Sequence, residues 1–167
     1  MDILMNRRSV RRFTEQKVEP EKIDRLMRVA MEAPSAQNQQ PWEFIVIDER
    51  AKIDELAEFS PYSGLLRGAP LAVVILERQG NRAQQFAPQD LGACTENLLL
   101  GAVEQGLGAV WMGVGKDNPR ETFLIDMFNL PERVKPFAVI AIGYPAEENA
   151  NRLVDRYEAD RVHYNKF

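Results

Sequence analysis

The sequence is poor in residues on which many active sites depend: its 167 residues include one cysteine, Cys94, and one histidine, His163. A single cysteine excludes an intrachain disulfide, and the pair leaves no His/Cys cluster for zinc. The Gly-x-Ser-x-Gly elbow of serine hydrolases is also missing. We therefore expect Cys94 to act as a small buried hydrophobe and His163 to be a surface or dimer-contact residue.

Long apolar runs and an excess of positive charge are also absent. No run approaches the roughly 18 apolar residues of a membrane span, and residues 1–6 are too short for the apolar region of a signal peptide. Lysine and arginine total 21 against 25 aspartates and glutamates, which gives a net charge of −4. This balance argues against a protein that coats nucleic acid or an anionic membrane. We expect a cytoplasmic protein with neither as a partner.

Against this acidic background one stretch gathers positive charge, because Arg7-Arg8-Ser9-Val10-Arg11-Arg12 holds four arginines and a hydroxyl. Arginine presents a planar fork of donors that stays charged, and serine adds a short neutral donor, so the set suits a phosphate. The stretch could instead be a solvated basic patch or a strand edge protected against pairing. A nucleic-acid-binding module built on these arginines is a distant alternative, which a salt-dependent affinity would reveal.

A second unusual stretch, residues 33–42, is free of charged side chains but holds one serine, one asparagine and three glutamines. Neutral amides and hydroxyls can hydrogen-bond the rim of a polar, uncharged ligand such as a ribityl chain or a pyrimidine ring. A loop that hydrogen-bonds to itself is the alternative interpretation.

The length and the 45% hydrophobic content indicate one domain with a sizeable core. Apolar periodicity and turn residues predict alternating helices and strands. The run Leu71–Leu76 has the character of a central strand covered on both faces. The predicted helices are residues 2–8, 20–33, 49–59, 88–105 and 118–128, and the predicted strands are 43–47, 71–76, 109–112 and 137–142.

The helix predicted for residues 88–105 carries three consecutive leucines, Leu98, Leu99 and Leu100. At about 100° per residue they cover roughly 200° of the helix circumference, so the helix must be buried nearly all round. In a short chain a second copy of the molecule is the natural cover. The charged tail, residues 147–167, would fray alone, and we expect it to lie on a partner protomer.

The turn Gly113-Val114-Gly115 follows a predicted strand. A dinucleotide fingerprint would need a third glycine at Asn118, and a P-loop would need a glycine at Val110. The remaining interpretation is an exposed backbone whose N–H groups can approach a flat ligand, because glycine has no side chain in the way.

Together these stretches resemble the nitroreductase family of FMN-dependent oxidoreductases. The resemblance extends over essentially the whole chain and also includes Glu96–Ala102, Gly106-Leu107-Gly108 and Gly143-Tyr144-Pro145 followed by Arg156. It implies an α+β fold with a mixed, largely antiparallel central sheet flanked by helices. It also implies an intertwined homodimer with two FMN sites at the interface. Residues 1–167 would then form a single FMN-binding domain, with 147–167 as a C-terminal arm on the partner protomer.

The resemblance also implies roles for individual residues. The phosphate of FMN would be bound by Arg7, Arg8, Ser9 and Arg156. Arg11 would lie near the pyrimidine end of the flavin as an electrostatic stabiliser. The other protomer would contribute Pro34, Ser35 and Asn38, and the backbone of Gly113, Val114 and Gly115 would lie beside the flavin N5 edge. No residue is needed as an acid or base, and no metal is needed, because the flavin does the chemistry.

The activity implied is transfer of hydride from NADH or NADPH, via FMN, to a nitroaromatic, a quinone or a similar flat acceptor. Only residues 77–87 separate the strand 71–76 from the long helix, which leaves no room for the helical excursion that covers the substrate in larger relatives. One open face would then serve donor and acceptor in turn, which is a ping-pong mechanism. The alternative is a flavoprotein of the same fold that performs reductive dehalogenation, flavin fragmentation or flavin storage.

Overall fold

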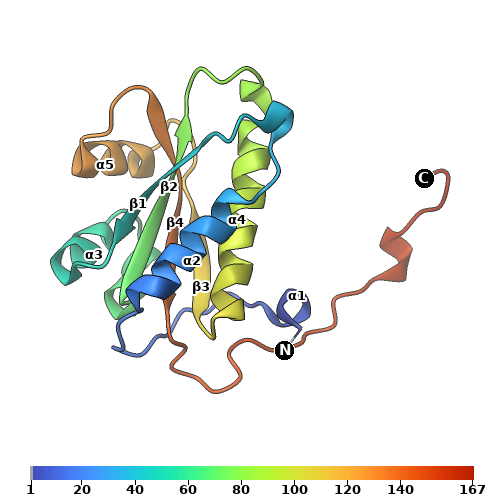
Figure 1. Cartoon of the computed structure of the whole chain (residues 1–167), viewed down its shortest axis with the longest axis horizontal. Coiled ribbons are helices and arrows are strands. Elements are labelled where there is room, and N and C mark those ends of the chain that lie inside the picture. Colours follow the sequence, from blue (N-terminus) through green and yellow to red (C-terminus); the bar gives the residue numbers. More distant parts are fainter. Residues whose placement is uncertain (1) are drawn as a thin grey trace.

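The computed structural model describes residues 2–167 and contains a four-stranded antiparallel sheet in the order β1-β2-β4-β3 (Figure 1). Helices cover both faces, so the expected α+β fold with a largely antiparallel sheet is confirmed. A parallel contact is found outside the strands, as an isolated bridge between Ser9 and Ala109. The strands are β1 (Trp42–Ile47), β2 (Leu71–Arg78), β3 (Gly108–Gly113) and β4 (Val134–Gly143).

The two faces of β2 form two separate cores. Leu71, Val73 and Ile75 point to the side covered by α2 and α4. The residues that alternate with them along the strand point to the side covered by α3 and α5. This two-sided burial explains the continuous apolar run of β2, because every position needs an apolar side chain. The helices are α1 (Ile3–Asn6), α2 (Pro20–Met31), α3 (Arg50–Leu56), α4 (Ala87–Glu104) and α5 (Pro119–Phe128).

Most element boundaries differ from the prediction by one or two residues, and three differences are described here. The first helix ends at Asn6, because Arg7 takes an extended conformation with ψ 127°, so Arg7 and Arg8 lie beyond it. The helix predicted for 49–59 is shorter and ends at Leu56. Strand β4 begins before its predicted start, because a bulge lets Leu76 pair with Pro136 while Ile75 pairs with Ala138.

The leucine-rich helix α4 is covered largely by its own chain. Leu98 and Leu99 are buried in the core between α2 and the sheet, and Leu100 is half-buried. The expectation that these leucines need a second copy for burial is therefore wrong for Leu98 and Leu99. Packing of α2 along α4 supplies that cover.

The chain leaves the sheet after β4 and ends as an arm that extends away from the body (Figure 1). Every residue from Arg152 onward is exposed. No helix within residues 2–167 is long and apolar enough to cross a membrane. Large apolar side chains exposed on the arm are Leu153, Val154, Tyr157, Val162, Tyr164 and Phe167.

Candidate functional site

The arginine-rich segment is fixed along one end of the sheet by backbone hydrogen bonds. The Val10 amide donates to the Ala109 carbonyl at 3.0 Å, and the Thr14 amide donates to the Tyr144 carbonyl at 2.9 Å. Val10 is buried, whereas its neighbours Ser9 and Arg11 are exposed. The alternation of an extended chain therefore puts the polar side chains on the outer side.

A glycine in β3 makes this close approach possible. A Cβ on Gly108 would lie 2.6 Å from the Cβ of Val10, a separation too short for two side-chain carbon atoms that are not bonded to each other. The absence of a side chain there lets the segment lie directly against the strand.

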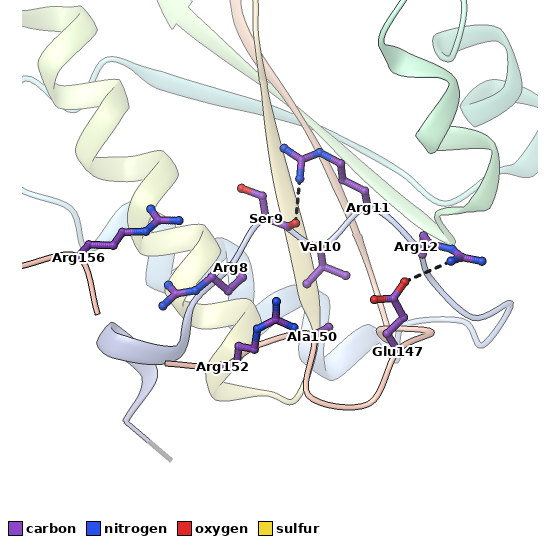
Figure 2. A pocket seen from close by; sticks show the side chains of 9 residues that line it. All are labelled: Arg8, Ser9, Val10, Arg11, Arg12, Glu147, Ala150, Arg152 and Arg156. Carbon is purple, nitrogen blue, oxygen red and sulfur yellow. Dashed lines mark hydrogen bonds and ion pairs between the residues drawn. The ribbon is translucent and has the colours of Figure 1, made fainter. Parts of the chain in front are cut away.

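Beside this segment lies a cavity of about 440 Å³, which we call the arginine pocket (Figure 2). Its one lining acid, Glu147, pairs with Arg12 at 3.3 Å, so the remaining arginines keep their charge uncompensated within the pocket. Such a pocket favours a ligand with more than one negative charge. Its lining residues are Arg8, Ser9, Val10, Arg11, Arg12, Glu147, Ala150, Arg152 and Arg156.

Arg8 is the centre of this charge cluster. Its guanidinium donates to backbone carbonyls, including that of Met5 at 3.0 Å, and its Nε is buried without a hydrogen-bond partner. Desolvation, followed by the nearby charges of Arg156, Arg7 and Arg152, lowers the pKa of Arg8 below its usual value. A bound anion would offset both effects and could accept from the unpartnered Nε.

Two of the pocket arginines come from the C-terminal arm. Asn151 holds the start of this arm, because its amide donates to the Leu107 carbonyl at 2.9 Å and its oxygen accepts from the Arg8 backbone amide at 3.3 Å. The arm then presents Arg152 and Arg156 to the pocket (Figure 2). The sequence predicted a site role for Arg156 but not for Arg152. Both arginines lie in the same short polar segment, which was a signal that could have identified Arg152 as well.

Arg7 does not line the arginine pocket. Its Nε pairs with a carboxylate oxygen of Glu96 on α4 at 2.9 Å. This ion pair fastens the residues after α1 to the long helix, which places the neighbouring Arg8 at the pocket. A direct role of Arg7 in binding stays a prediction.

Arg11 joins the arginine pocket to a second cavity of about 230 Å³, which we call the aromatic cavity. Gly113 lines this second cavity, and nothing lies within 4 Å of where its Cβ would stand. Val114 instead donates its amide to the Phe137 carbonyl at 3.0 Å, while a Cβ on Gly115 would meet Asn118. One chain therefore brings Arg8, Ser9, Arg11, Arg156 and Gly113 to a continuous region.

The uncharged loop lies at the start of α4. Asp90, which is 6% exposed, accepts from the Ala36 amide at 2.9 Å and from Gln39 Nε2 at 2.6 Å. Asn38 has a φ of +52° and accepts from the Gln40 side chain. The loop is thus hydrogen-bonded internally and to α4, while Asn38 and Pro34 remain exposed.

The loop and the arginine pocket lie at opposite ends of α4. The helix has 18 residues, so its ends are roughly 27 Å apart at about 1.5 Å per residue. Asp90 holds the loop at the start of the helix, whereas Asn151 is bound to Leu107, just beyond its end. Within one chain, therefore, Pro34, Ser35 and Asn38 do not join the other predicted site residues.

Residues 4–60 and 60–144 match the sequence model described as the nitroreductase family. The chain belongs to the nitroreductase family. The resemblance seen in the sequence is thereby confirmed. Curated relatives include a protein from Methanothermobacter thermautotrophicus, provisionally named NADH dehydrogenase/NAD(P)H nitroreductase, which is 36% identical over 100% of this chain and 87% of its own length.

Solved structures of this family have the same fold. A protein from Clostridium acetobutylicum, provisionally named NADH oxidase, is 48% identical with a TM-score of 0.95, over 99% of this chain and 100% of that one. A provisionally assigned nitroreductase from Desulfovibrio desulfuricans was crystallised in complex with FMN. It is 28% identical with a TM-score of 0.79, over 99% of this chain and 95% of that one.

Cys94 lies apart from the arginine pocket, on the buried face of α4. Burial raises the pKa of its thiol to about 12, so the thiol stays protonated near neutral pH. The expectation of a small buried hydrophobe is confirmed. His163 lies on the exposed arm, where the centroid of its ring is 4.2 Å from the centroid of the Phe167 ring.

Proposed function

We propose that this nitroreductase-family chain binds FMN and transfers hydride from NADH or NADPH to a flat acceptor such as a nitroaromatic or a quinone. The observation that carries this proposal is the convergence of Arg8, Arg152 and Arg156 on one pocket with no free acid among its lining residues. A phosphate monoester carries nearly two negative charges and several acceptor oxygens, which matches this donor set. The family relative crystallised with FMN supports the choice of ligand.

The chain's residues divide the work of binding. Arg8, Arg152, Arg156 and Ser9 hold the phosphate, and the unpartnered Nε of Arg8 gains an acceptor. Arg11, between the two cavities, supplies positive charge where negative charge develops in the reaction. The uncovered backbone at Gly113 leaves room for a flat ring. When bound, FMN supplies the hydride-transfer chemistry itself.

A second protomer completes the site in this proposal. Pro34, Ser35 and Asn38 are too far from the arginine pocket within one chain, so the partner contributes them. The exposed apolar side chains of residues 147–167 are covered by the same partner. The homodimer thus explains two features that the single chain leaves without a role.

The order of reaction follows from the short link between β2 and α4. This link contains only a one-turn 3-10 helix, Gln84–Phe86, and provides no lid over the site. Donor and acceptor therefore use one open site in turn, which is a ping-pong order. A quinone takes the two electrons of one hydride together with protons and leaves as a hydroquinone.

Titration of the purified apoprotein with FMN and with riboflavin tests the assignment of the arginine pocket. We expect FMN to bind more tightly, and Arg8→Ala or Arg156→Ala to weaken FMN roughly 10- to 100-fold, the range for losing a charged hydrogen bond. Riboflavin affinity should hardly change. Arg161→Ala is the matched control, because Arg161 lies on the same arm but pairs with Glu158 at 2.8 Å. Equal affinities of the wild-type protein for FMN and riboflavin would refute the assignment.

A further inference from the structure

The uncharged loop and the link between β2 and α4 meet at the start of α4 (Figure 1) and line a cavity there. The cavity has a volume of about 360 Å³, and we call it the amide cavity. Most of its lining side chains are neutral amides, one is an arginine, and none is acidic. Such a lining suits a polar ligand that carries hydroxyl groups and phosphate. The lining residues are Gln37, Asn38, Gln39, Gly80, Asn81 and Arg82.

Hydrogen bonds between the loop and the link preform this cavity. The Gln39 side chain donates to the Ala83 carbonyl at 3.0 Å and accepts from the Ala83 amide at 3.1 Å. Arg78, at the end of β2, donates to the Gln40 carbonyl at 2.8 Å and to the Gln39 carbonyl at 3.2 Å. The two sides of the amide cavity are therefore fixed to each other, so a ligand does not have to order them.

The backbone of the loop is strained around the cavity. Gln37, Asn38 and Gln40 have φ values of +53°, +52° and +46°, in the left-handed region that residues other than glycine seldom adopt. Each such residue costs free energy and persists only when surrounding contacts hold it. Hydrogen bonds to Asp90 and from Arg78 supply those contacts. Because strained residues gather at ligand sites, this strain indicates a binding role for the loop.

The charge of Arg82 is available to a ligand. Its backbone is held on both sides, because the Asn81 amide donates to the Gln84 side chain at 2.9 Å and the Ala83 amide donates to Gln39. The Arg82 side chain is exposed, and no acidic group lies within 4 Å of it in residues 2–167. An arginine in this setting can bind a phosphate through paired N–H groups.

The amide cavity lies beside the flavin of the other protomer in the proposed two-protomer site. There FMN fills the arginine pocket and the aromatic cavity of one chain, and the partner contributes Asn38. The amide cavity includes Asn38 but shares no lining residue with either of those two cavities, so it is open next to the flavin and not filled by it. The donor places its nicotinamide ring on the flavin, so its ribose and phosphate groups extend beyond the flavin edge.

We propose that the amide cavity binds the phosphate-bearing part of the nicotinamide donor, and that Arg82 makes this contact at the flavin site of the partner protomer. Arg82 binds a donor phosphate, and the amide side chains around it hydrogen-bond the ribose hydroxyls. The inference rests on the proposed function, because it concerns the donor used at the same site. It goes beyond that function by assigning a residue that recognises the donor and by placing it on the opposite chain.

Stopped-flow reduction of the FMN-loaded protein without an acceptor tests the role of Arg82. The donors are NADH, NADPH and N-benzyl-1,4-dihydronicotinamide, which keeps the reacting ring but lacks the phosphates. We expect Arg82→Gln to lower the reduction rate at subsaturating NADH or NADPH about fivefold, the upper range for one exposed ion pair, and to leave the benzyl donor nearly unchanged. Added salt should reduce the advantage of the wild-type protein. An equal loss with all three donors would overturn the inference.

Arg82→Lys and Lys135→Gln are the matched variants. Arg82→Lys keeps the positive charge and should retain part of the rate that Arg82→Gln loses. Lys135 is exposed on β4 and does not line the amide cavity, so Lys135→Gln removes one charge elsewhere and should leave all three rates unchanged. If Lys135→Gln slows reduction by NADH as Arg82→Gln does, the overall field of the protein causes the effect and the inference is overturned.

Two further measurements separate a donor contact from a contact with the cofactor or the acceptor. FMN affinity should be the same in Arg82→Gln as in the wild type, and weaker FMN binding would assign the side chain to the cofactor. Oxidation of the reduced variant by a neutral quinone should also keep its rate, and slower oxidation would assign Arg82 to the acceptor. Either deviation overturns the inference.

A mixed dimer tests whether Arg82 acts on the flavin of the partner. One protomer carries Arg82→Gln and the other carries Arg8→Ala, so one site combines an intact arginine pocket with an intact Arg82 from the opposite chain. We expect FMN held at this site to be reduced by NADH at the wild-type rate. A rate as low as that of the Arg82→Gln homodimer would show that Arg82 serves the flavin of its own chain, which overturns the inference.

Calorimetric titration of the FMN-loaded protein with ADP-ribose, the donor fragment without nicotinamide, separates this inference from the proposed function. ADP-ribose binding that Arg82→Gln weakens supports the amide cavity even if no donor reduces the flavin, a result that would contradict the reductase function alone. Reduction of Arg82→Gln by all three donors at wild-type rates would overturn the inference and leave the reductase function standing.

Discussion

At the scale of single residues, Tyr144 connects two parts of the chain through a pair of opposite charges. Its hydroxyl donates to a carboxylate oxygen of Glu19 at 2.7 Å and accepts from Lys22 Nζ at 2.7 Å. The hydrogen bond from Tyr144 is the main cause that lowers the pKa of Glu19 below its usual 4.5. The backbone carbonyl of Tyr144 also accepts from the Thr14 amide, so this cluster joins the start of α2 to the residues just after the arginine-rich segment.

A lowered carboxyl pKa has a defined effect on stability. The stabilisation is fully present above the ordinary pKa of about 4.5 and is lost as the pH falls through the lowered value. We expect Tyr144→Phe to lower the Tm near pH 7, and the loss to become smaller below about pH 4.5. Thermal unfolding measured at pH 7 and at pH 3.5 checks this.

Glu19→Gln is the companion variant for this measurement. Its side chain cannot titrate, so in that background the effect of Tyr144→Phe should be the same at both pH values. A Tyr144→Phe loss that is equally large at pH 7 and pH 3.5 in the otherwise wild-type protein would contradict the role given to Glu19.

At the scale of elements, the start of β3 sets the position of the arginine-rich segment. Because a Cβ on Gly108 would lie 2.6 Å from Val10, Gly108→Ala must displace residues 9 and 10 or the strand. We expect a loss of about 1–3 kcal/mol in the free energy of unfolding, as for other overpacked sites. FMN binding should weaken as well, because Arg8 and Arg11 flank the displaced residues. Denaturant unfolding and FMN titration measure the two effects.

Gly68→Ala provides the matched control, because nothing lies within 4 Å of the Cβ that it adds and its φ is not in the left-handed region. It should leave both stability and FMN affinity close to those of the wild type. If Gly108→Ala behaved like Gly68→Ala, the close packing of Val10 on β3 would not be what positions the arginines.

At the scale of the whole molecule, the C-terminal arm carries large exposed apolar side chains that a single chain leaves uncovered, with Tyr164 81% exposed. If a partner covers them, folding and association are coupled, and the unfolding midpoint should rise with protein concentration. Removing residues 158–167 should weaken this dependence yet keep Arg152 and Arg156. Removing 147–167 should abolish FMN binding as well.

Thermal unfolding over a hundredfold range of concentration, together with sedimentation and FMN titration, measures these effects. The shorter deletion separates loss of the partner contact from loss of the pocket arginines. A midpoint independent of concentration in the full-length protein, or a sedimenting monomer that holds FMN, would contradict the two-protomer site.

The sequence by itself determined what depends on near neighbours. The apolar run of β2 predicted a doubly covered central strand, Pro20 marked the start of α2, and Asn118-Pro119 marked the start of α5. These features were readable because caps, prolines and side-chain periodicity act within a few residues. The arginine-rich segment was readable for the same reason, since its four arginines lie next to or near one another along the chain.

Tertiary structure alone decided which of these side chains meet. Arg8 and Asn151 are 143 positions apart, yet their contact sets the start of the arm and brings Arg152 into the pocket. Glu96 forms an ion pair with Arg7, which does not line the arginine pocket, and Asp90 holds the uncharged loop at the far end of α4. Bonds of this kind depend on how the long helix packs on the sheet, and that packing is fixed by the whole core rather than by any stretch of sequence.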